Sequence, residues 1–410
     1  MKKIELLAPA GSFEKAKIAF MYGADAVYAG TSKLSLRTRA EMNSDDLQDT
    51  IKYAHKIGKK VYVALNIYAY DNDYEEIIKE VKRLDNIGAD AIIASDPGII
   101  ACIKENAKDM EIHISTQANV TSLNSAMFWY NYGAKRIILA RELSYEKIKH
   151  IMENKPKDLE IEMFIHGAIC FAYSGRCYLS QYLSDRGANC GDCSQPCRWQ
   201  YKVSAEEVNK PGSVINIDFD EKGTYIFSSK YLCLLKQLPK IIDMKMDSLK
   251  IEGRLKTDYY LATVVRSYRK AIDDYYDSKE KWDYMKYLPE LEKVKTRGLS
   301  EFYFSDPQNQ DIHDFDGFSE NLKYEYGAKV KESLGNDLYL VEIRNKLSLN
   351  DTLDVLKPND LDSHEFKIEE LYDSVTKEKI DTVNPGTKGK SVIIKVPFKL
   401  EKDYIIRRKK

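Results

Sequence analysis

Short apolar runs alternate with amphipathic stretches along the first two-thirds of the chain. Most of the runs are rich in β-branched or aromatic residues, which is typical of strands buried on both faces of a parallel sheet. They lie at residues 4–10, 25–30, 60–67, 90–95, 111–116, 135–140, 159–167 and 248–253. Eight such runs with helices between them predict an α/β fold, a (β/α)8 TIM-like barrel. A doubly wound open sheet is the alternative, but no GxGxxG motif follows the first run.

The helical patterns between these runs end at glycines. Gly23, Gly58, Gly88 and Gly133 each follow an amphipathic stretch and precede the next apolar run. Glycine is favoured directly after the last turn of a helix, because it adopts the left-handed conformation without a clash. These glycines therefore predict where the preceding helices end.

The chain changes character after the eighth run. A helix is predicted at residues 257–276, followed by a stretch rich in Tyr and Lys. From residue 324 onwards, short alternating stretches are separated by Gly, Asn and Asp turns, which indicates antiparallel strands. We predict a barrel at 1–297 with a cysteine-rich insertion at 168–235, a linker at 298–323, and a small antiparallel β-barrel-like module at 324–410.

Charge and hydropathy exclude some classes of protein. Lys and Arg number 63 against 64 Asp and Glu, for a formal net charge of −1, so only a local basic face would attract nucleic acid. The N-terminal apolar run is interrupted at Gly11, Ser12 and Glu14, unlike a signal peptide. No later stretch approaches a membrane span. We therefore predict a soluble, cytoplasmic protein whose cysteines are reduced thiols or metal ligands.

The cysteines are concentrated in the predicted insertion. Five of the seven lie within 28 residues, at Cys170, Cys177, Cys190, Cys193 and Cys197. Thiolates gathered this closely in a cytosolic protein usually hold a metal or an iron–sulfur cluster. Zinc ribbons use two CxxC pairs, whereas only Cys190 and Cys193 have that spacing, so the irregular gaps favour a 4Fe–4S cluster. Because the insertion follows the seventh strand, we expect the cluster on the catalytic side of the barrel.

Polar side chains follow several of the predicted strands. His166 ends the seventh run, where it could transfer a proton or bind a carboxylate, and a structural histidine is the alternative. Gln117 lies beyond the fifth run and Asn66 closes the third, so their amides are candidates to orient a substrate, although Asn66 also suits a turn. His113 lies within the fifth run and is expected to face the barrel core.

Arginines also gather at the strand ends. Arg37 and Arg39 follow the second strand, Arg141 the sixth and Arg254 the eighth, while Arg176 lies between the first two cysteines. Guanidinium groups that converge on one edge suggest an anionic ligand, because each can grip a carboxylate or phosphate with two hydrogen bonds. We predict catalytic roles for Arg141 and Arg254, substrate binding for Arg37 and Arg176, and a surface ion pair for Arg39.

Several motifs resemble the signature of the peptidase U-32 family, the collagenase-like peptidases. The resemblance covers residues 4–270, and the tail resembles the family's C-terminal β module. The matching segments are 6–11 (LLAPAG), 25–30, 162–170 (EMFIHGAIC), 174–180 (SGRCYLS), 193–199, 229–233 and 250–254 (KIEGR).

This resemblance implies a function that the residues alone do not name. Several members look like prephenate-dependent hydroxylation proteins with a 4Fe–4S cluster, acting on the wobble uridine of tRNA, on a cytidine of 23S rRNA, or on a ubiquinone precursor. Length and the β tail make this chain most similar to the branch that forms 5-hydroxyuridine in tRNA. Carried over by motif, the cluster ligands would be Cys170, Cys177, Cys193 and Cys197, with Cys233 as the alternative fourth ligand and Cys190 outside the usual pattern.

Two other functions remain open. The first is a collagenase-like peptidase that is either Cys–His or metal dependent. The chain has neither HExxH nor GxSxG, and a Cys170–His166 dyad is the main rival to the cluster. A non-catalytic iron–sulfur scaffold is the second, and it leaves the converging arginines without a role.

Overall fold

The computed structural model describes residues 3–31, 34–35, 42–170, 172–190, 192–199, 204–206, 214–216, 229–305, 312, 323–386 and 390–410. Its contacts divide the chain into two compact units. The barrel unit comprises Met1–Phe13, Ala26–Leu255 and Thr296–Ser319. The β unit comprises Glu14–Asp25, Lys256–Lys295 and Glu320–Lys410. No helix in this described part of the chain is long and apolar enough to cross a lipid bilayer.

The described part of the barrel unit contains a closed sheet of eight parallel strands. They pair in the order β1-β2-β3-β4-β5-β6-β7-β11, and β11 also pairs with β1. Each strand overlaps one of the predicted apolar runs, so the predicted TIM-like barrel is confirmed. The strands are β1 (Glu5–Pro9), β2 (Ala26–Gly30), β3 (Lys60–Ala64), β4 (Ala91–Ala94), β5 (Glu111–Ile114), β6 (Arg136–Ile138), β7 (Glu160–Ala168) and β11 (Ser248–Ile251).

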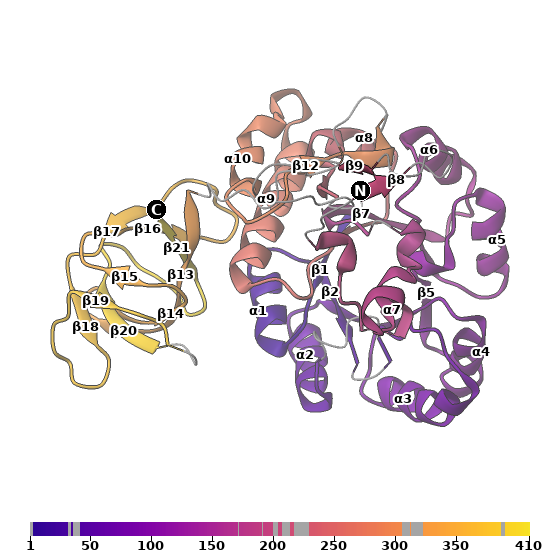
Figure 1. Cartoon of the computed structure of the whole chain (residues 1–410), viewed down its shortest axis with the longest axis horizontal. Coiled ribbons are helices and arrows are strands. Elements are labelled where there is room, and N and C mark those ends of the chain that lie inside the picture. Colours follow the sequence, from indigo (N-terminus) through magenta and orange to yellow (C-terminus); the bar gives the residue numbers. More distant parts are fainter. Residues whose placement is uncertain are drawn as a thin grey trace. The chain divides into compact units, whose positions relative to one another are not determined.

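Helices connect the strands, and α2 to α6 lie around the outside of the barrel (Figure 1). The connecting helices are α1 (Phe13–Met21), α2 (Ser44–Lys56), α3 (Tyr74–Asn86), α4 (Pro97–Asn106), α5 (Leu123–Asn131), α6 (Tyr145–Asn154) and α8 (Leu238–Asp243). Side-chain caps fix where some of them begin: Asn43 accepts a hydrogen bond from the backbone N–H of Asp46 at α2. The predicted glycine ends are confirmed, as at Gly58 and Gly88, whose φ angles are +68° and +79°.

The barrel interior is filled by alternate residues of the strands, because successive side chains of a strand point to opposite faces. This core contains Leu7, Ala26, Tyr28, Tyr62, Ala64, Ala91, Ile93 and Ile138. Aliphatic and aromatic side chains from neighbouring strands therefore pack together inside the barrel.

The cysteine-rich insertion is anchored at both ends on β7. The chain leaves the barrel at Ala168 and returns through β10 (Tyr231–Cys233), which pairs antiparallel with the end of β7. In this pairing Tyr231 lies opposite Ala168 and Cys233 opposite His166. A short strand, β12 (Leu299–Ser300), pairs with β10. Within the insertion lie α7 (Leu179–Ser184) and the paired strands β8 (Ser204–Glu206) and β9 (Val214–Asn216).

The β unit contains an antiparallel sheet, as the turn pattern after residue 324 predicted. The strand order is β17-β16-β21-β13-β14-β20-β18, and β15 pairs with β19 separately. Residues 256–295, which the sequence assigned to the barrel, group with this unit, and the predicted domain boundaries stay a prediction. The elements are α9 (Asp258–Asp277), α10 (Leu288–Leu291), β13 (Tyr324–Gly335), β14 (Leu338–Ile343), β15 (Leu347–Ser348), β16 (Thr352–Leu356), β17 (Glu365–Lys367), β18 (Leu371–Asp373), β19 (Thr382–Val383), β20 (Lys390–Lys395) and β21 (Ile405–Lys409).

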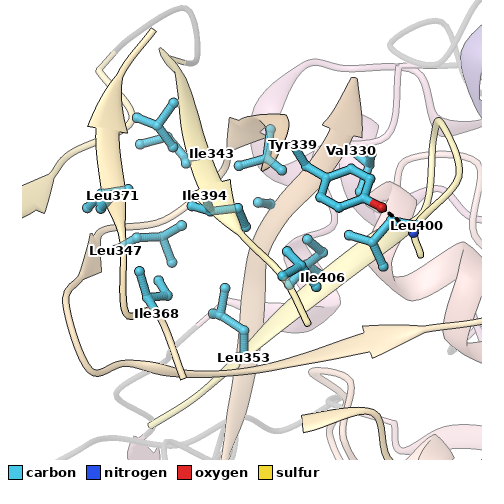
Figure 2. Packing of buried hydrophobic residues seen from close by; sticks show 14 of the residues in the cluster. Val330, Tyr339, Ile343, Leu347, Leu353, Ile368, Leu371, Ile394, Leu400 and Ile406 are labelled. Atoms are coloured by element: carbon cyan, nitrogen blue, oxygen red, sulfur yellow. Dashed lines mark hydrogen bonds between the residues drawn. The ribbon is translucent and has the colours of Figure 1, made fainter. Parts of the chain in front are cut away.

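An apolar core holds the sheet of the β unit together (Figure 2). Its side chains come from alternate positions, as in β14, where Tyr339, Val341 and Ile343 are buried. The Tyr339 hydroxyl is satisfied inside this core, because it accepts a hydrogen bond from the backbone N–H of Leu400 at 3.1 Å.

Candidate functional site

A pocket of about 150 Å³ opens at the carboxyl ends of the barrel strands. This rim pocket lies where TIM barrels place their active sites. Its apolar wall is formed by Tyr28, Ala64, Ile93, Ile138 and Phe164. Its polar lining consists of Asn66, Ser115, Thr116, Gln117, Arg141, Lys250, Glu252 and Arg254. The cysteine-rich insertion contributes Cys170, Gly175, Cys177, Ala188 and Cys193.

Arg254 enters the pocket from the loop after β11 and is only 5 % exposed. Its Nη1 donates a hydrogen bond to Ser35 Oγ at 3.4 Å, and its guanidinium carbon lies 5.8 Å from the ring centre of Tyr28. The end of β2 makes room for it, because a Cβ at Gly30 would lie 2.2 Å from Nη1. Only glycine at position 30 is therefore compatible with this position of Arg254.

Arg141 lines the same pocket from the loop after β6. Its Nη1 donates to the carbonyl of Ala168 at 3.2 Å, and its guanidinium carbon lies 5.2 Å from the ring centre of Phe164. The structure thus brings together two of the arginines that the sequence singled out. Arg37 and Arg39 lie outside the described residues.

Arg176 has a different position from the other arginines. It is exposed and does not line the pocket, but its Nε and Nη2 donate to the backbone carbonyl of Gln117 at 3.0 and 2.7 Å. Gln117 does line the pocket, as does Asn66. The side-chain Oε1 of Gln117 is buried and has no hydrogen-bond partner among the residues that the structure describes. Arg176 therefore orients the turn that presents the Gln117 amide to the pocket.

The two histidines are buried and do not line the pocket. His166 is fully buried within β7. His113 is fully buried inside the barrel, where its ring centre lies 4.7 Å from that of Tyr62, and burial lowers its pKa. His113 therefore faces the barrel core, while a catalytic role of His166 stays a prediction.

Sequence reasoning missed a charged pair in the barrel interior. Lys250, only 4 % exposed, lines the rim pocket and donates from Nζ to Glu162 Oε1 at 2.8 Å. Glu162 is fully buried and also accepts from Arg136 Nη1 at 3.0 Å. Arg136 in turn contacts Glu5 and Glu160, each at 2.6 Å. The sequence did contain a signal for this pair, because Lys250 and Glu162 are charged residues within runs that were predicted to be strands buried on both faces.

These charges shift one another's ionisation. Burial lowers the pKa of Lys250, and the positive charges of Arg136 and Arg254 act in the same direction, whereas Glu162 opposes the shift. Burial alone would raise the pKa of Glu162, but the charges of Lys250 and Arg136 outweigh it and lower that pKa. Glu162 therefore stays ionised between the two cations.

The structure brings together the four cysteines that the family motif marks. Cys170, Cys177 and Cys193 line the rim pocket. Burial raises the pKa of both Cys177 and Cys197, and the negative charges of Cys170 and Cys193 act in the same direction on each. The four thiols are thus close enough for their charges to interact. Cys233 lies buried in β10 and is not part of the pocket lining, while the side chain of Cys190 lies outside the described part.

The cysteines can be compared with the ligands that a metal ion or an iron–sulfur cluster needs. Among the described side chains, no group of three or more His, Cys, Asp or Glu converges tightly enough to hold one metal ion. A 4Fe–4S cluster is bound by four cysteines, one at each iron, so its ligands surround a larger centre than one ion. Four partly buried thiols that repel one another when ionised are compatible with such a centre.

The chain is thus an α/β protein with a TIM-like barrel, a cysteine-rich insertion at the rim of that barrel and an antiparallel β domain. Sequence comparison then identifies the family. The pattern of peptidase family U32 matches residues 11–314, and that of the peptidase family U32 C-terminal domain matches residues 323–407. The chain belongs to peptidase family U32, as the sequence motifs indicated.

Relatives within this family have different names. The chain is 36 % identical to tRNA hydroxylation protein P of Escherichia coli strain K12, over 99 % of this chain and 96 % of that protein. It is 32 % identical to 23S rRNA 5-hydroxycytidine C2501 synthase of the same organism, over 86 % of this chain and 52 % of that protein. It is also 30 % identical to a collagenase of Porphyromonas gingivalis, over 97 % and 95 % of the two chains.

Proposed function

We propose that this chain is a tRNA-modifying hydroxylase that forms 5-hydroxyuridine at the wobble position, with prephenate as co-substrate and a 4Fe–4S cluster as cofactor. The carrying observation is a pocket in which cationic side chains lie beside three thiols, in a chain that matches tRNA hydroxylation protein P over nearly its full length. The RNA substrate rests on that relative, and the small-molecule chemistry rests on the pocket.

The pocket's charge supports a small organic acid as ligand. Among the lining residues, Arg141, Lys250 and Arg254 supply three positive charges against the one carboxylate of Glu252, and Lys250 also pairs with the buried Glu162. Guanidinium groups bind carboxylates with two parallel hydrogen bonds, so Arg141 and Arg254 are suited to hold prephenate, which has two carboxylates. The apolar wall would contact its carbon ring, and the Gln117 amide would orient a polar group of the acid.

The cysteines supply the second part of the proposal. Cys170, Cys177, Cys193 and Cys197 would hold the cluster next to the bound acid. A 4Fe–4S cluster supplies electron transfer or Lewis-acid activation when it is bound. The antiparallel β unit offers a second surface to position a large RNA, as modules of this kind often do.

A second candidate function is peptide hydrolysis, which the similarity to a collagenase favours. It would need Cys170 as nucleophile and His166 as base. The pocket lining includes Cys170 but not His166. Purified protein should therefore leave gelatin uncleaved. Cleavage that disappears in Cys170→Ala but survives removal of iron would establish the peptidase instead.

Mass spectrometry of tRNA nucleosides tests the proposed function. A strain that lacks the gene should lose 5-hydroxyuridine and its derivatives, and blocking prephenate synthesis should have the same effect. Wild type should restore the modification, whereas Arg254→Ala and Cys177→Ser should not. Arg83→Ala is the matched control, because the half-buried Arg83 lies on α3 outside the pocket lining and pairs with Glu80 of the same helix at 2.6 Å. Persistence of 5-hydroxyuridine in the deletion strain would contradict the proposal and direct attention to ribosomal RNA.

A further inference from the structure

Lys250 is a buried cation whose hydrogen-bonding capacity is only partly used. Its ammonium has three N–H donors, and within the described residues Glu162 Oε1 is its only hydrogen-bond acceptor, at 2.8 Å. On another side Nζ lies 4.4 Å from the ring centre of Tyr28, a favourable contact that accepts no conventional hydrogen bond. Because Lys250 lines the rim pocket, donors remain for a ligand there.

Glu162 contacts two cations, Lys250 and Arg136, and Arg136 also pairs with Glu5 and Glu160. The other oxygen of Glu162 accepts from Arg136 at 3.0 Å, so one carboxylate lies between two cations. Arg254, itself 5 % exposed, adds a like charge that interacts with Lys250. Buried like charges are unfavourable unless an anion compensates them. An anion in the pocket would therefore contact both Lys250 and Arg254 favourably.

The cations enter the pocket at two depths. Lys250 belongs to β11 itself, whereas Arg254 lies three residues beyond the end of that strand and Arg141 follows β6. Apolar side chains such as Tyr28 and Phe164 form the wall of the pocket. An acid with two carboxylates and an apolar part would match this arrangement, whereas an acid with one carboxylate would leave one of the cationic positions without a partner.

We propose that Lys250 is the innermost ligand-binding group of the rim pocket, where it binds one carboxylate of a small dicarboxylic acid whose other carboxylate is held by Arg254 and Arg141. Glu162 and Arg136 position the Lys250 side chain for this contact. The identity of the acid as prephenate rests on the proposed function, but the need for two carboxylates does not.

Calorimetric titration of the anaerobically purified protein tests this inference. The ligands are prephenate and malonate, which have two carboxylates, and phenylpyruvate, which has one. Lys250→Met should weaken the binding of prephenate and malonate at least tenfold and change the affinity for phenylpyruvate less than twofold. Lys250→Gln, which can still bond Glu162, should give the same pattern. Lys240→Met, at an exposed position in α8, should change nothing.

The outcomes separate this inference from the proposed function. If malonate binding depends on Lys250 but prephenate does not bind, prephenate is the wrong acid and the Lys250 site stands. If both Lys250 variants bind the dicarboxylates as tightly as wild type, the inference is overturned whatever the acid is. If neither variant folds, as judged by circular dichroism, the affinities of the wild-type protein for prephenate and phenylpyruvate test the inference. A preference for prephenate over phenylpyruvate of tenfold or more supports the inference, and equal affinities overturn it.

Discussion

Replacing Glu290 with glutamine should destabilise the β unit without altering the rim pocket. Glu290 is buried at the end of α10, in the centre of an ion network. Its Oε2 accepts from Arg266 Nη2 at 2.5 Å and from Arg407 Nη1 at 2.8 Å. Arg407 also contacts Asp354 at 2.5 Å, so the network joins α9 and α10 to strands β16 and β21.

The size of the expected loss of stability in Glu290→Gln follows from the ionisation of Glu290. Burial alone would raise its pKa, but the hydrogen bond from Arg407 and the charges of Arg266 and Arg407 outweigh it and lower the pKa from its ordinary 4.5 to about 2. That difference corresponds to about 3 kcal/mol of stability at pH 7. Removal of one partner from a buried ion pair costs about 3–5 kcal/mol, which is of the same size.

The pH dependence has a definite sign. Because the folded-state pKa of Glu290 is depressed, its contribution is complete above pH 4.5 and is lost as the pH falls towards 2. At pH 3.5 about 2 kcal/mol should remain. Since a glutamine amide resembles the protonated carboxyl group, the gap between wild type and Glu290→Gln should narrow as the pH falls.

The assay is urea unfolding followed by the fluorescence of Trp282. This residue lies in the β unit and its Nε1 donates to the carbonyl of Ala271, while Trp129 and Trp199 are replaced by phenylalanine in all variants. Glu292→Gln is the matched control, because Glu292 is exposed in the same segment and should change stability by less than about 0.5 kcal/mol. A loss below about 1 kcal/mol at pH 7 in Glu290→Gln, or a gap that does not narrow with acid, refutes this reasoning.

Two further predictions concern the site. Anaerobically purified wild type should contain about four irons per chain. The Cys177→Ser and Cys197→Ser variants should lose the iron, whereas Cys233→Ser should keep it, because the charge of Cys197 interacts with the other three thiolates. Colourless protein with stoichiometric zinc would contradict the predicted cluster. Gly30→Ala should weaken prephenate binding at least tenfold, since the added Cβ would displace Arg254. The double variant Gly30→Ala/Arg254→Ala should bind prephenate no more weakly than Arg254→Ala alone.

The barrel was predictable from the sequence because its signals are local. Each strand is a short, strongly apolar run, and positive-φ glycines such as Gly58 and Gly88 close the helices that follow. Pairing of β10 with the end of β7 was not predictable. It involves three residues of a strand that returns after a long insertion, and three residues carry no periodicity.

The site was predictable only in part, for a similar reason. Cysteine spacing and strand-end arginines are visible along the chain, and the structure indeed gathers Cys170, Cys177, Cys193, Arg141 and Arg254 at one pocket. Room for Arg254 depends on a glycine more than two hundred positions earlier, a relation that only the closed sheet creates.

Interior charge gives a reason to seek function inside this barrel as well as at its rim. Buried ion pairs such as Lys250–Glu162 add little stability on their own, and apolar residues of similar size often serve a fold equally well. A barrel core needs only packed apolar side chains to be stable. The series from Arg136 through Glu162 to Lys250 ends at the pocket lining, so the Lys250 ammonium lies where we propose that the ligand binds. If Lys250→Met proves as stable as wild type yet loses the dicarboxylate, binding and not folding explains why the charges are there.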